Sequence, residues 1–286
     1  MTVGDFRGQI PAQLDWLRAS DQGRLWLQDL PRAVEESAAH WKLRLGEPFP
    51  YAFTSLAIPG RMEDGRDVVL KVQHVDRETE HEALALRHWD GDGAILLLDQ
   101  FPARDALLLE RCIPGTPVPP DKALEVLIGL LPRLWKPATA PPFRTLADEA
   151  AHWAAKLSGR RDLNPRLADA ALDAIAHLAT SQGEQVLLHQ DLHGWNVLAA
   201  QREPWLVIDP KPLVGEREFG LAPIIRSLEL GGGRRDVLRR LDHLTSELGL
   251  DRERARQWCI AQTVAWSVAE GDVPDHVRVV EWLLEG

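Results

Sequence analysis

Three polar side chains, each next to a short apolar run, carry the clearest chemistry in this sequence. Asp191 is followed five residues later by Asn196, and Asp209 comes eighteen residues after Asp191. The neighbouring apolar runs, which read as short buried strands, are residues 186–188, 197–198 and 206–208. We therefore expect the three side chains to lie at the ends of neighbouring strands. Phosphoryl transfer from ATP requires such a set, because one carboxylate orients the attacking hydroxyl while an amide and a second carboxylate hold Mg2+.

The spacing of these residues also matches a known catalytic loop. His189, Asp191 and Asn196 have the H-x-D-x-x-x-x-N spacing of the protein kinases. The competing interpretation is that Asp191 and Asp209 are ordinary turn residues after strands. We expect His189 to hydrogen-bond within the loop and to hold its backbone near Asp191. His189 and His193 have the spacing of a helical zinc pair, but a loop that contains Gly and Asn is a poor helix, so zinc is not expected.

A lysine in the N-terminal third could neutralise the α- and β-phosphates of a nucleotide. Lys71 lies in an alternating stretch that reads as a half-buried strand, where kinases carry the lysine of V-A-I-K. Eleven residues later, Glu82 lies on the apolar face of a helix predicted from Arg77 to Trp89, so we assign it as the ion-pair partner of Lys71. Thr79-x-x-Glu82 also fits a capping box, in which Glu82 would only close the helix start. Glu78 is then the alternative partner.

The rest of a nucleotide site is less clearly marked. No G-x-G-x-x-G precedes the strand of Lys71, although backbone amides near Thr54 and Ser55 could cover the phosphates. A last strand of this region runs into a connector rich in Pro and Gly. We expect the backbone of Glu110 to Cys112 to hydrogen-bond the adenine edge there, with a plain strand end as the equally weighted alternative.

These motifs together resemble the aminoglycoside O-phosphotransferases, and within them the streptomycin 6-kinase and hydroxyurea phosphotransferase branch. The resemblance covers roughly residues 45 to 275 and is most specific in Glu203-Pro-Trp-Leu-Val-Ile-Asp-Pro-Lys211 and in the run from Gly215 to Pro223. It implies that Asp191 is the catalytic base, that Asn196 and Asp209 bind Mg2+, and that ATP is the donor, with GTP as an open alternative.

The catalytic loop departs from the pattern usual in that family, which is H-G-D-L-H-x-G-N. Gln190 replaces the first Gly, and Gly194-Trp195 stands in reversed order. By the resemblance, Trp195 lies beside the substrate cleft. These changes leave the preferred acceptor open, although they do not touch the residues assigned to the chemistry.

The resemblance and the periodicity imply an α+β, protein-kinase-like fold of two lobes, with a small β-rich N-lobe and a larger, mainly helical C-lobe. The first region is expected to use Trp16, Trp26 and Trp41 as packing anchors. The predicted regions are an N-terminal helical segment (1–45), a nucleotide-binding N-lobe (46–111), a hinge (112–120) and a C-lobe with the catalytic loop and acceptor site (121–286). Within the last, helices are expected over 121–134, 145–157 and 165–180, and again from residue 224 onward.

Composition indicates an ordinary globular enzyme. Hydrophobic residues make up 45% of the chain and charged residues 27%, and no apolar run approaches the roughly 20 residues of a membrane span. No signal peptide is expected at the start of the chain, so we expect a cytoplasmic protein, monomeric or a weak dimer. The net charge of −10 argues against nucleic acid or an anionic membrane as the partner. Cys112 and Cys259 are expected to be reduced core residues.

The acceptor site is suggested by charge. Residues 241–286 hold nine acidic residues and four arginines, a net charge of −5, and an acidic helix end near the catalytic loop would suit a small cationic antibiotic. We name Glu270 and Asp272 as acceptor contacts ahead of Asp275, with Trp195 beside them. The alternative is a solvated acidic surface whose tryptophans belong to the core.

Three functions remain in competition at this stage. The favoured one is a small-molecule kinase, an ATP-dependent phosphotransferase with an alcohol group as acceptor, that modifies an aminoglycoside-type antibiotic resembling streptomycin. The second is a kinase of the same fold for hydroxyurea, choline or a sugar, and the third is a catalytically silent nucleotide-binding protein. A protein kinase fits poorly, because Asp209 is followed by Pro-Lys and no A-P-E element appears downstream.

Overall fold

The chain folds into two compact units. The structure, a computed structural model, describes residues 10–50, 53–271 and 273–286. The N-terminal unit comprises the residues up to Gly115 together with Ala200–Leu206. The C-terminal unit comprises Thr116–Ala199 and Val207–Gly286. Among the described residues, no helix is both long enough and apolar enough to cross a membrane.

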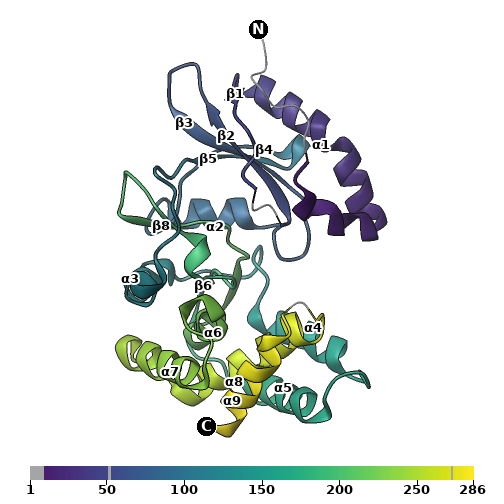
Figure 1. The fold of residues 1–286 in the computed structure, drawn as a ribbon, viewed down its shortest axis with the longest axis vertical. Helices are drawn as coiled ribbons and strands as arrows, with labels where there is room; N and C mark the ends of the chain where they lie inside the picture. Colours follow the sequence, from purple (N-terminus) through teal and green to yellow (C-terminus); the bar gives the residue numbers. More distant parts are fainter. Residues whose placement is uncertain (1–9, 51–52, 272) are drawn as a thin grey trace. The chain divides into compact units, whose positions relative to one another are not determined.

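The N-terminal unit is built on a five-stranded antiparallel sheet with strand order β1-β2-β3-β5-β4, beside which α1 lies (Figure 1). Its elements are η1 (Ala12–Ala19), α1 (Asp21–His40), β1 (Arg44–Leu45), β2 (Ser55–Arg61), β3 (Asp67–Gln73), α2 (Glu82–Trp89), β4 (Leu97–Phe101), η2 (Pro102–Arg104) and β5 (Ala106–Glu110).

The alternation of strand β3 determines which side chains meet which helix. Leu70 and Val72 belong to one apolar core with Leu30 of α1, and all three are buried. Successive side chains of a strand point to opposite faces of the sheet. Lys71 therefore points to the other face, where its ammonium reaches Glu82 of α2. A sequence that alternates in this way places one charged side chain among apolar neighbours without putting it into the core.

The tryptophans of the first region are only partly what the sequence predicted. Trp26 is half-buried and donates its indole N–H to the carbonyl of Gln73 at 2.7 Å, and Trp41 is buried and donates to Oδ2 of Asp99 at 2.8 Å. These two anchor α1 and its end to the sheet. Trp16 is not a core anchor, because 48% of its surface is exposed.

Helix α2 begins later than the periodicity predicted. The expected start at Arg77 is wrong, since the helix begins at Glu82. The Oδ1 atom of Asp76 accepts hydrogen bonds from the backbone and the hydroxyl of Thr79, at 2.9 and 3.1 Å, and so holds the preceding residues in a turn. The Thr79 hydroxyl is thus engaged with Asp76. The N-cap of α2 is His81, with no side-chain cap bond, so the capping box considered for Glu82 is absent.

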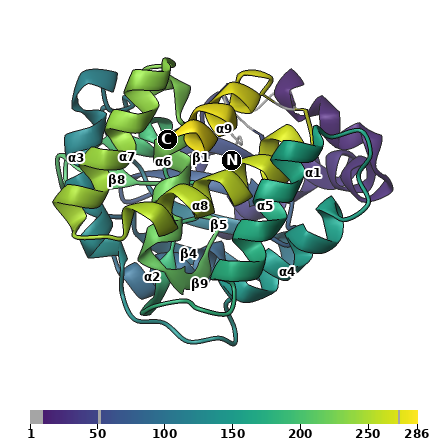
Figure 2. The same ribbon diagram turned by 90° about the horizontal axis from the view of Figure 1, so that it is seen from below.

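The C-terminal unit is mainly helical, and α8 lies alongside α5 at its centre (Figure 2). Its elements are α3 (Pro120–Leu134), α4 (Leu146–Leu157), α5 (Pro165–Leu178), β6 (Gln185–Leu188), η3 (Gly194–Asn196), β7 (Val197–Ala199), β9 (Leu213–Glu216), η4 (Arg217–Leu221), α6 (Ala222–Arg226), η5 (Leu228–Leu230), α7 (Arg234–Leu248), α8 (Arg252–Thr263), the π-helical segment η6 (Val264–Val268) and α9 (Asp275–Glu285). Strand β8 (Trp205–Val207) begins among the residues of the N-terminal unit and ends at the first residue after it.

The three helices predicted ahead of the catalytic loop are present, and their caps explain their starts. Helices α3, α4 and α5 agree with the expected ranges within two residues at each end. Thr145 and Asp148 form a capping box at the start of α4. Asn164 caps α5 by accepting from the backbone N–H of Arg166 at 3.0 Å, and proline occupies the first helical position. Local signals therefore define these ends before any tertiary contact forms.

The pairing of β6 with β9 brings two distant parts of the sequence together. The strands are antiparallel, with Leu188 opposite Leu213. The loop that follows β6 and the segment that precedes β9 consequently lie at the same end of the pair. The backbone N–H of Lys211 donates to the carbonyl of His189 at 3.0 Å and continues the pairing by one step. The residues around Asp191 and around Asp209 thus become neighbours.

A buried carboxylate at the other end of β9 joins the strand to α8. Glu216 is 1% exposed and accepts from the backbone N–H of Gly183 at 2.9 Å, from Nη2 of Arg254 at 2.8 Å, and from the indole N–H of Trp258. A buried charge is tolerated only when its oxygens are fully paired in this way. The ring of Phe219 packs against Trp258 with centroids 5.5 Å apart, so the polar contacts lie beside an aromatic core.

Replacing Glu216 with Ala should lower the free energy of unfolding by about 3 kcal/mol, because Arg254 and Trp258 would lose their acceptor in a buried site. Urea unfolding followed by circular dichroism measures the change. The matched control is Glu184→Ala, which removes a carboxylate that is 61% exposed and paired with Arg217. It should cost less than about 1 kcal/mol. Equal losses in the two variants would contradict the role given to Glu216.

Candidate active site

The lysine predicted for the phosphates is paired as expected within the N-terminal unit. Lys71 lies in the middle of the sheet, between Ala57 of β2 and Leu107 of β5. Its Nζ is 2.7 and 2.6 Å from the two carboxylate oxygens of Glu82, and the two residues are 5% and 1% exposed. Gln73 also donates to Glu82, at 2.7 Å. The predicted ion pair is therefore present, and Glu82 is the partner. The pair fixes an ammonium at a defined position on the sheet.

At the end of β5, the side chain of Glu110 makes contacts that the sequence analysis did not predict. The backbone N–H of Glu110 donates to the carbonyl of Leu96, and its carboxylate accepts from the N–H of Leu96 at 2.9 Å. The same carboxylate accepts from Nε and Nη2 of Arg202 at 2.9 and 3.0 Å. The side chain of Glu110 is thus structural, which leaves the backbone carbonyl for the predicted adenine contact. Arg202 was missed, because the sequence gives no signal that pairs residues so far apart.

Cys112 follows this strand end and is buried. Burial raises the pKa of its thiol to about 12, and the nearby carboxylate of Glu110 raises it further than burial alone. The residue is therefore a neutral thiol near pH 7 and no nucleophile. Cys259 is also buried with a raised pKa, about 11, again mainly because of burial. Both cysteines are free thiols, as the sequence predicted.

In the C-terminal unit, His189 holds the backbone of the loop that contains Asp191. Its Nε2 lies 2.9 Å from the carbonyl of Ile208, and its Nδ1 accepts from the N–H of Asp191 at 3.3 Å. A carbonyl can only accept, so Nε2 carries the proton. Burial lowers the pKa of His189 to about 4 although the Ile208 carbonyl works against it. The ring is therefore neutral at pH 7 and ties the loop to the segment before Asp209, which confirms the structural role predicted for it.

Asn196 is bound to the same loop through its amide nitrogen. Its Nδ2 donates to the backbone carbonyl of Asp191 at 2.9 Å. The backbone carbonyl of Asn196 accepts from the N–H of Ile208 at 3.0 Å. Because the nitrogen is engaged, Oδ1 is the atom that Asn196 would offer to a cation. Asp209 follows directly after Ile208, in the left-handed backbone region with φ of 59°. One backbone hydrogen bond thus fixes the separation of the two residues predicted to bind metal.

The donors gathered here suit a hard cation. An amide oxygen and a carboxylate are the groups that Mg2+ takes from proteins, usually with phosphate oxygens and water completing six ligands. Within the part of the chain that the structure describes, no group of three or more His, Cys, Asp or Glu side chains could hold a metal by itself. The assignment of Asn196 and Asp209 as Mg2+ ligands stays a prediction.

The carboxylate of Asp191 is close to a lysine. Its Oδ2 lies 3.3 Å from Nζ of Lys211, and about a fifth of each side chain is exposed (23% and 22%). Burial by itself would raise the pKa of Asp191. The opposing positive charge of Lys211, helped by His193 and Arg226, holds the pKa below its ordinary value. Asp191 is therefore ionised at neutral pH, as a group that accepts a proton from a hydroxyl must be.

The reversed Gly-Trp order in the loop has a structural counterpart in Glu229, which sequence reasoning missed. The N–H of Gly194 donates to Oε1 of Glu229 at 2.6 Å, and a Cβ at this position would lie 2.8 Å from that oxygen. Burial would raise the pKa of Glu229, but hydrogen bonding to His193 lowers it below the usual value. A side chain at this position would meet the Glu229 carboxylate, which would have to shift to make room. Trp195 is 55% exposed.

The structure does not show the residues predicted to contact a cationic acceptor gathered in one site. Glu270 is 46% exposed and its Oε1 lies 2.6 Å from Nζ of Lys156, so its charge is already offset. Asp272 lies outside the described residues. Asp275 is in the first turn of α9, where an acidic residue favours the helix start. The acceptor role of these three residues therefore stays a prediction.

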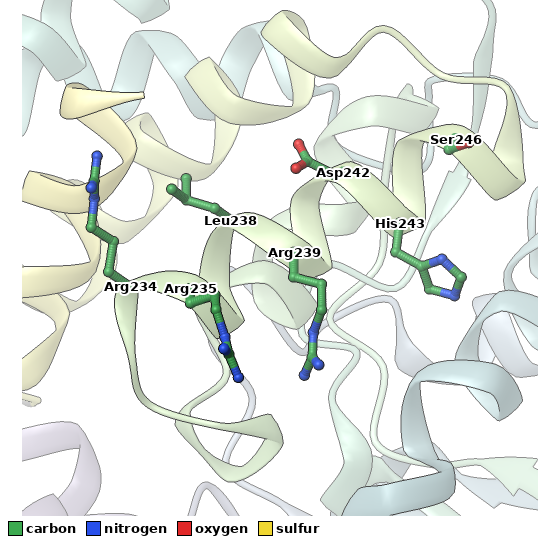
Figure 3. A pocket seen from close by; sticks show the side chains of 7 residues that line it. All are labelled: Arg234, Arg235, Leu238, Arg239, Asp242, His243 and Ser246. Carbon is green, nitrogen blue, oxygen red and sulfur yellow. The ribbon is translucent and has the colours of Figure 1, made fainter.

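An open pocket on the surface of the C-terminal unit is lined by a different set of residues (Figure 3). Its volume is about 730 Å³, and every lining residue belongs to α7. The lining residues are Arg234, Arg235, Leu238, Arg239, Asp242, His243 and Ser246. One exposed face of a single helix encloses no ligand, and Arg239 is already paired with Asp236 at 3.3 Å.

Gln190 has a backbone conformation that favours glycine. Its φ is 63°, it is 1% exposed, and its carbonyl accepts from Nε2 of Gln262 at 3.1 Å. Its side-chain oxygen is 3.4 Å from Nη2 of Arg144, and its side-chain nitrogen is buried with no hydrogen-bond partner in the described part of the chain. The left-handed region costs a residue with a Cβ about 1 kcal/mol. This explains why a glycine is usual at this position in the family that the loop resembles.

We predict that Gln190→Gly is more stable than Gln190→Ala by about 0.5–1 kcal/mol, which reverses the usual order of the two residues. Both variants remove the same side chain, so the comparison isolates the backbone. Gln185, in strand β6, is the control position, and there Ala should be the more stable of the two. Urea unfolding of the four variants decides the point. If Gly were the less stable at both positions, φ at residue 190 would not be a source of strain.

Comparison with known families and relatives agrees with this chemistry. Residues 40–273 match the family described as aminoglycoside/hydroxyurea antibiotic resistance kinase. A hydroxyurea phosphotransferase of Kitasatospora aureofaciens is 38% identical, over 96% of this chain and 86% of that protein. A streptomycin 6-kinase of Streptomyces griseus is 36% identical, over 92% of each chain.

Solved structures show the same fold at low sequence identity. The choline kinase LicA from Streptococcus pneumoniae has a TM-score of 0.65 at 13% identity, with 90% of this chain and 99% of that chain covered. A thermostable mutant of the aminoglycoside phosphotransferase APH(4)-Ia, in a ternary complex with ADP and hygromycin B, has a TM-score of 0.63 at 15% identity, with 88% and 96% covered. The predicted α+β, protein-kinase-like fold is confirmed.

The family match and the relatives also confirm the predicted kind of enzyme, a phosphotransferase. They favour it over the alternative of a catalytically silent nucleotide-binding protein. With a family match over residues 40–273 and relatives 36–38% identical along more than nine-tenths of its length, the chain belongs to the aminoglycoside/hydroxyurea antibiotic resistance kinases.

Proposed function

We propose that the chain transfers the γ-phosphoryl group of ATP to a hydroxyl of a small acceptor, with Asp191 as the base. The observation that carries this proposal is the state of Asp191. Its carboxylate is kept ionised beside Lys211, and its backbone is held on either side by His189 and Asn196. A base must have both properties, because it has to accept a proton at a defined point.

The N-terminal unit supplies the nucleotide-binding part of the proposal. The ammonium of Lys71, fixed by Glu82, would neutralise the α- and β-phosphates. The backbone from Glu110 to Cys112 would bind the adenine edge, a role that ATP and GTP could both satisfy. We keep residues 46–111 as the nucleotide-binding lobe, 112–120 as the hinge and 121–286 as the lobe for catalysis and acceptor binding.

In the C-terminal unit, Asn196 through Oδ1 and Asp209 through its carboxylate would hold Mg2+. When bound, the ion would offset the negative charge of the phosphates during transfer. The acceptor hydroxyl gives its proton to the Asp191 carboxylate as its oxygen forms a bond to the γ-phosphorus. The bond between that phosphorus and the oxygen leading to the β-phosphate breaks, and ADP leaves with the electron pair.

We propose an aminoglycoside-type antibiotic resembling streptomycin as the acceptor. The relative from Streptomyces griseus, which is named for streptomycin, and the net charge of −5 over residues 241–286 support a cationic acceptor. Hydroxyurea is the second candidate, and the relative from Kitasatospora aureofaciens supports it. The pairing of Glu270 with Lys156 also favours this second candidate, since a cationic acceptor would have to compete with Lys156 for the carboxylate.

An acceptor screen with ATP and Mg2+, read by ADP release and by mass spectrometry of the product, tests the proposal. We expect phosphorylation of streptomycin or hydroxyurea, and loss of turnover by at least about 1000-fold in Asp191→Asn with little change in nucleotide affinity. Glu184→Gln is the control, because that carboxylate is on the surface. Turnover of hydroxyurea alone would replace the antibiotic assignment. Full turnover by Asp191→Asn would overturn the role of Asp191.

Magnesium binding provides a separate test. Asp209→Ala should weaken the binding of the magnesium–nucleotide complex about 10- to 100-fold, because it removes a charged ligand, whereas Asn196→Ala should mainly reduce kcat. Isothermal titration calorimetry at several Mg2+ concentrations measures the binding, and steady-state kinetics measures kcat. Asp191→Asn serves as the comparison and should bind the complex nearly as the native protein does. An unchanged apparent metal affinity in Asp209→Ala would remove Asp209 from the metal site.

A further inference from the structure

Trp266 lies against two cations in the C-terminal unit. The Nζ of Lys211 is 4.8 Å from the centre of its ring, and the guanidinium carbon of Arg226 is 5.4 Å from it. Both distances are within the range in which an aromatic face attracts a cation. The indole N–H of Trp266 is buried and has no hydrogen-bond partner among the described residues. The ring therefore contributes through its face and not through its nitrogen.

An unusual helical turn sets the position of this ring. Helix α8 ends at Thr263 and continues as the π-helical segment η6, in which Ala269 donates to the carbonyl of Val264, five residues back, at 2.8 Å. Such a turn inserts one residue relative to an α-helix and rotates the side chains that follow. If α8 continued as a regular α-helix, the side chain of Trp266 would point in a different direction from the one it has here. π-helical turns are frequent at functional sites.

The first of the two cations, Lys211, contacts the carboxylate of Asp191. Lys211 lies 3.3 Å from Oδ2 of Asp191, so that oxygen is directed toward the lysine. The other oxygen, Oδ1, is then the one left to receive the proton of an acceptor. A lysine side chain is flexible, and confining it costs conformational entropy. The face of Trp266 restricts the positions that Lys211 can take.

The second cation, Arg226, is connected through hydrogen bonds to the backbone that precedes Asp191. Arg226 is buried and donates through Nη1 to Oε1 of Gln262. Gln262, which is fully buried, donates in turn to the carbonyl of Gln190 at 3.1 Å. Gln190 precedes Asp191 and has the left-handed φ described above. An external hydrogen bond to its carbonyl helps to hold that conformation.

We propose that Trp266 is the platform of a positioning device, in which Lys211 orients the Asp191 carboxylate and Arg226, through Gln262, fixes the backbone before it. The proposal rests on the function proposed above, because it concerns the base of that reaction. Lys211, Arg226 and Trp266 are positioning residues that act through Asp191. Their loss should therefore reduce kcat and leave the KM for ATP almost unchanged.

Steady-state kinetics test the link to catalysis. Lys211→Met and Trp266→Leu should each lower kcat about 10- to 100-fold, with the KM for ATP changed less than about threefold. Lys211→Arg and Trp266→Phe keep the cation and the aromatic face, and should recover most of the loss. The double variant Lys211→Met/Trp266→Leu should be no worse than the poorer single variant, because both act on one carboxylate.

Hydrogen exchange tests the positioning without any need for an acceptor. Exchange of backbone amides in residues 189–196, measured by mass spectrometry, should be about 10-fold faster in Trp266→Leu and in Arg226→Met than in the native protein. The matched control is Arg278→Met, which breaks another cation–π contact, 5.3 Å from Trp282 on α9. It should change neither this exchange nor kcat.

The two readouts separate failure of the proposal from failure of the proposed function. If the native protein phosphorylates no acceptor, the function is wrong, and the exchange experiment still judges the platform. Native-like exchange of residues 189–196 in Trp266→Leu would overturn the platform. Native kcat in Lys211→Met, in a protein that turns over an acceptor, would overturn the orienting role of Lys211. If Lys211→Met fails to fold, a kcat in Trp266→Phe as low as that in Trp266→Leu would overturn the proposal.

Discussion

The antiparallel pairing of β6 with β9 is the constraint on which the candidate active site depends. It places the loop after Leu188 and the segment before Leu213 at one end of the strand pair. Three hydrogen bonds then extend that relation beyond the strands, from Lys211 to His189, from His189 to Ile208 and from Ile208 to Asn196. Each joins residues that are distant in sequence, two of the bonds between backbone groups and one from the His189 ring to a backbone carbonyl. The chemistry-bearing side chains project from a framework that these bonds make rigid.

The site also has to hold carboxylates that would repel one another. Asp191 and Asp209 both act on His189, which lies between the segments that carry them, and burial keeps that histidine neutral. The balancing positive charge is brought in from further along the chain, chiefly by Lys211. Burial disfavours an ionised carboxylate, whereas a nearby ammonium favours it. For Asp191 the ammonium prevails, and this makes the carboxylate available as a base.

The N-terminal unit solves a related problem with a different device. Strand alternation turns Leu70 into the core and Lys71 away from it, so that one strand serves both packing and charge. A turn held by Asp76 delays the start of α2 until Glu82. The first residue of that helix is then the one that meets the lysine. Here a local turn, rather than a long-range pairing, brings the partners into register.

Much of this could be read from the sequence, because the signals are local. The spacing of Asp191, Asn196 and Asp209 between apolar runs indicated the candidate active site, and alternation around Lys71 indicated a strand and its ion pair. The helices α3 to α5 were predictable because their caps and apolar periodicity are written in consecutive residues. Composition likewise indicated a globular protein.

Some contacts could be found only in the tertiary structure. They join residues that are far apart in the sequence, at spacings that match no secondary-structure period or motif. Nothing in the sequence pairs Glu110 with Arg202, Gly194 with Glu229, or Lys211 with Trp266. The same holds for Glu270, whose charge is offset by Lys156 of α4. The sequence by itself determined which groups could perform phosphoryl transfer and on which elements they stand. The charges and hydrogen bonds that orient those groups were decided by packing, because ion pairs and cation–π contacts depend on distance in space and not on distance along the chain.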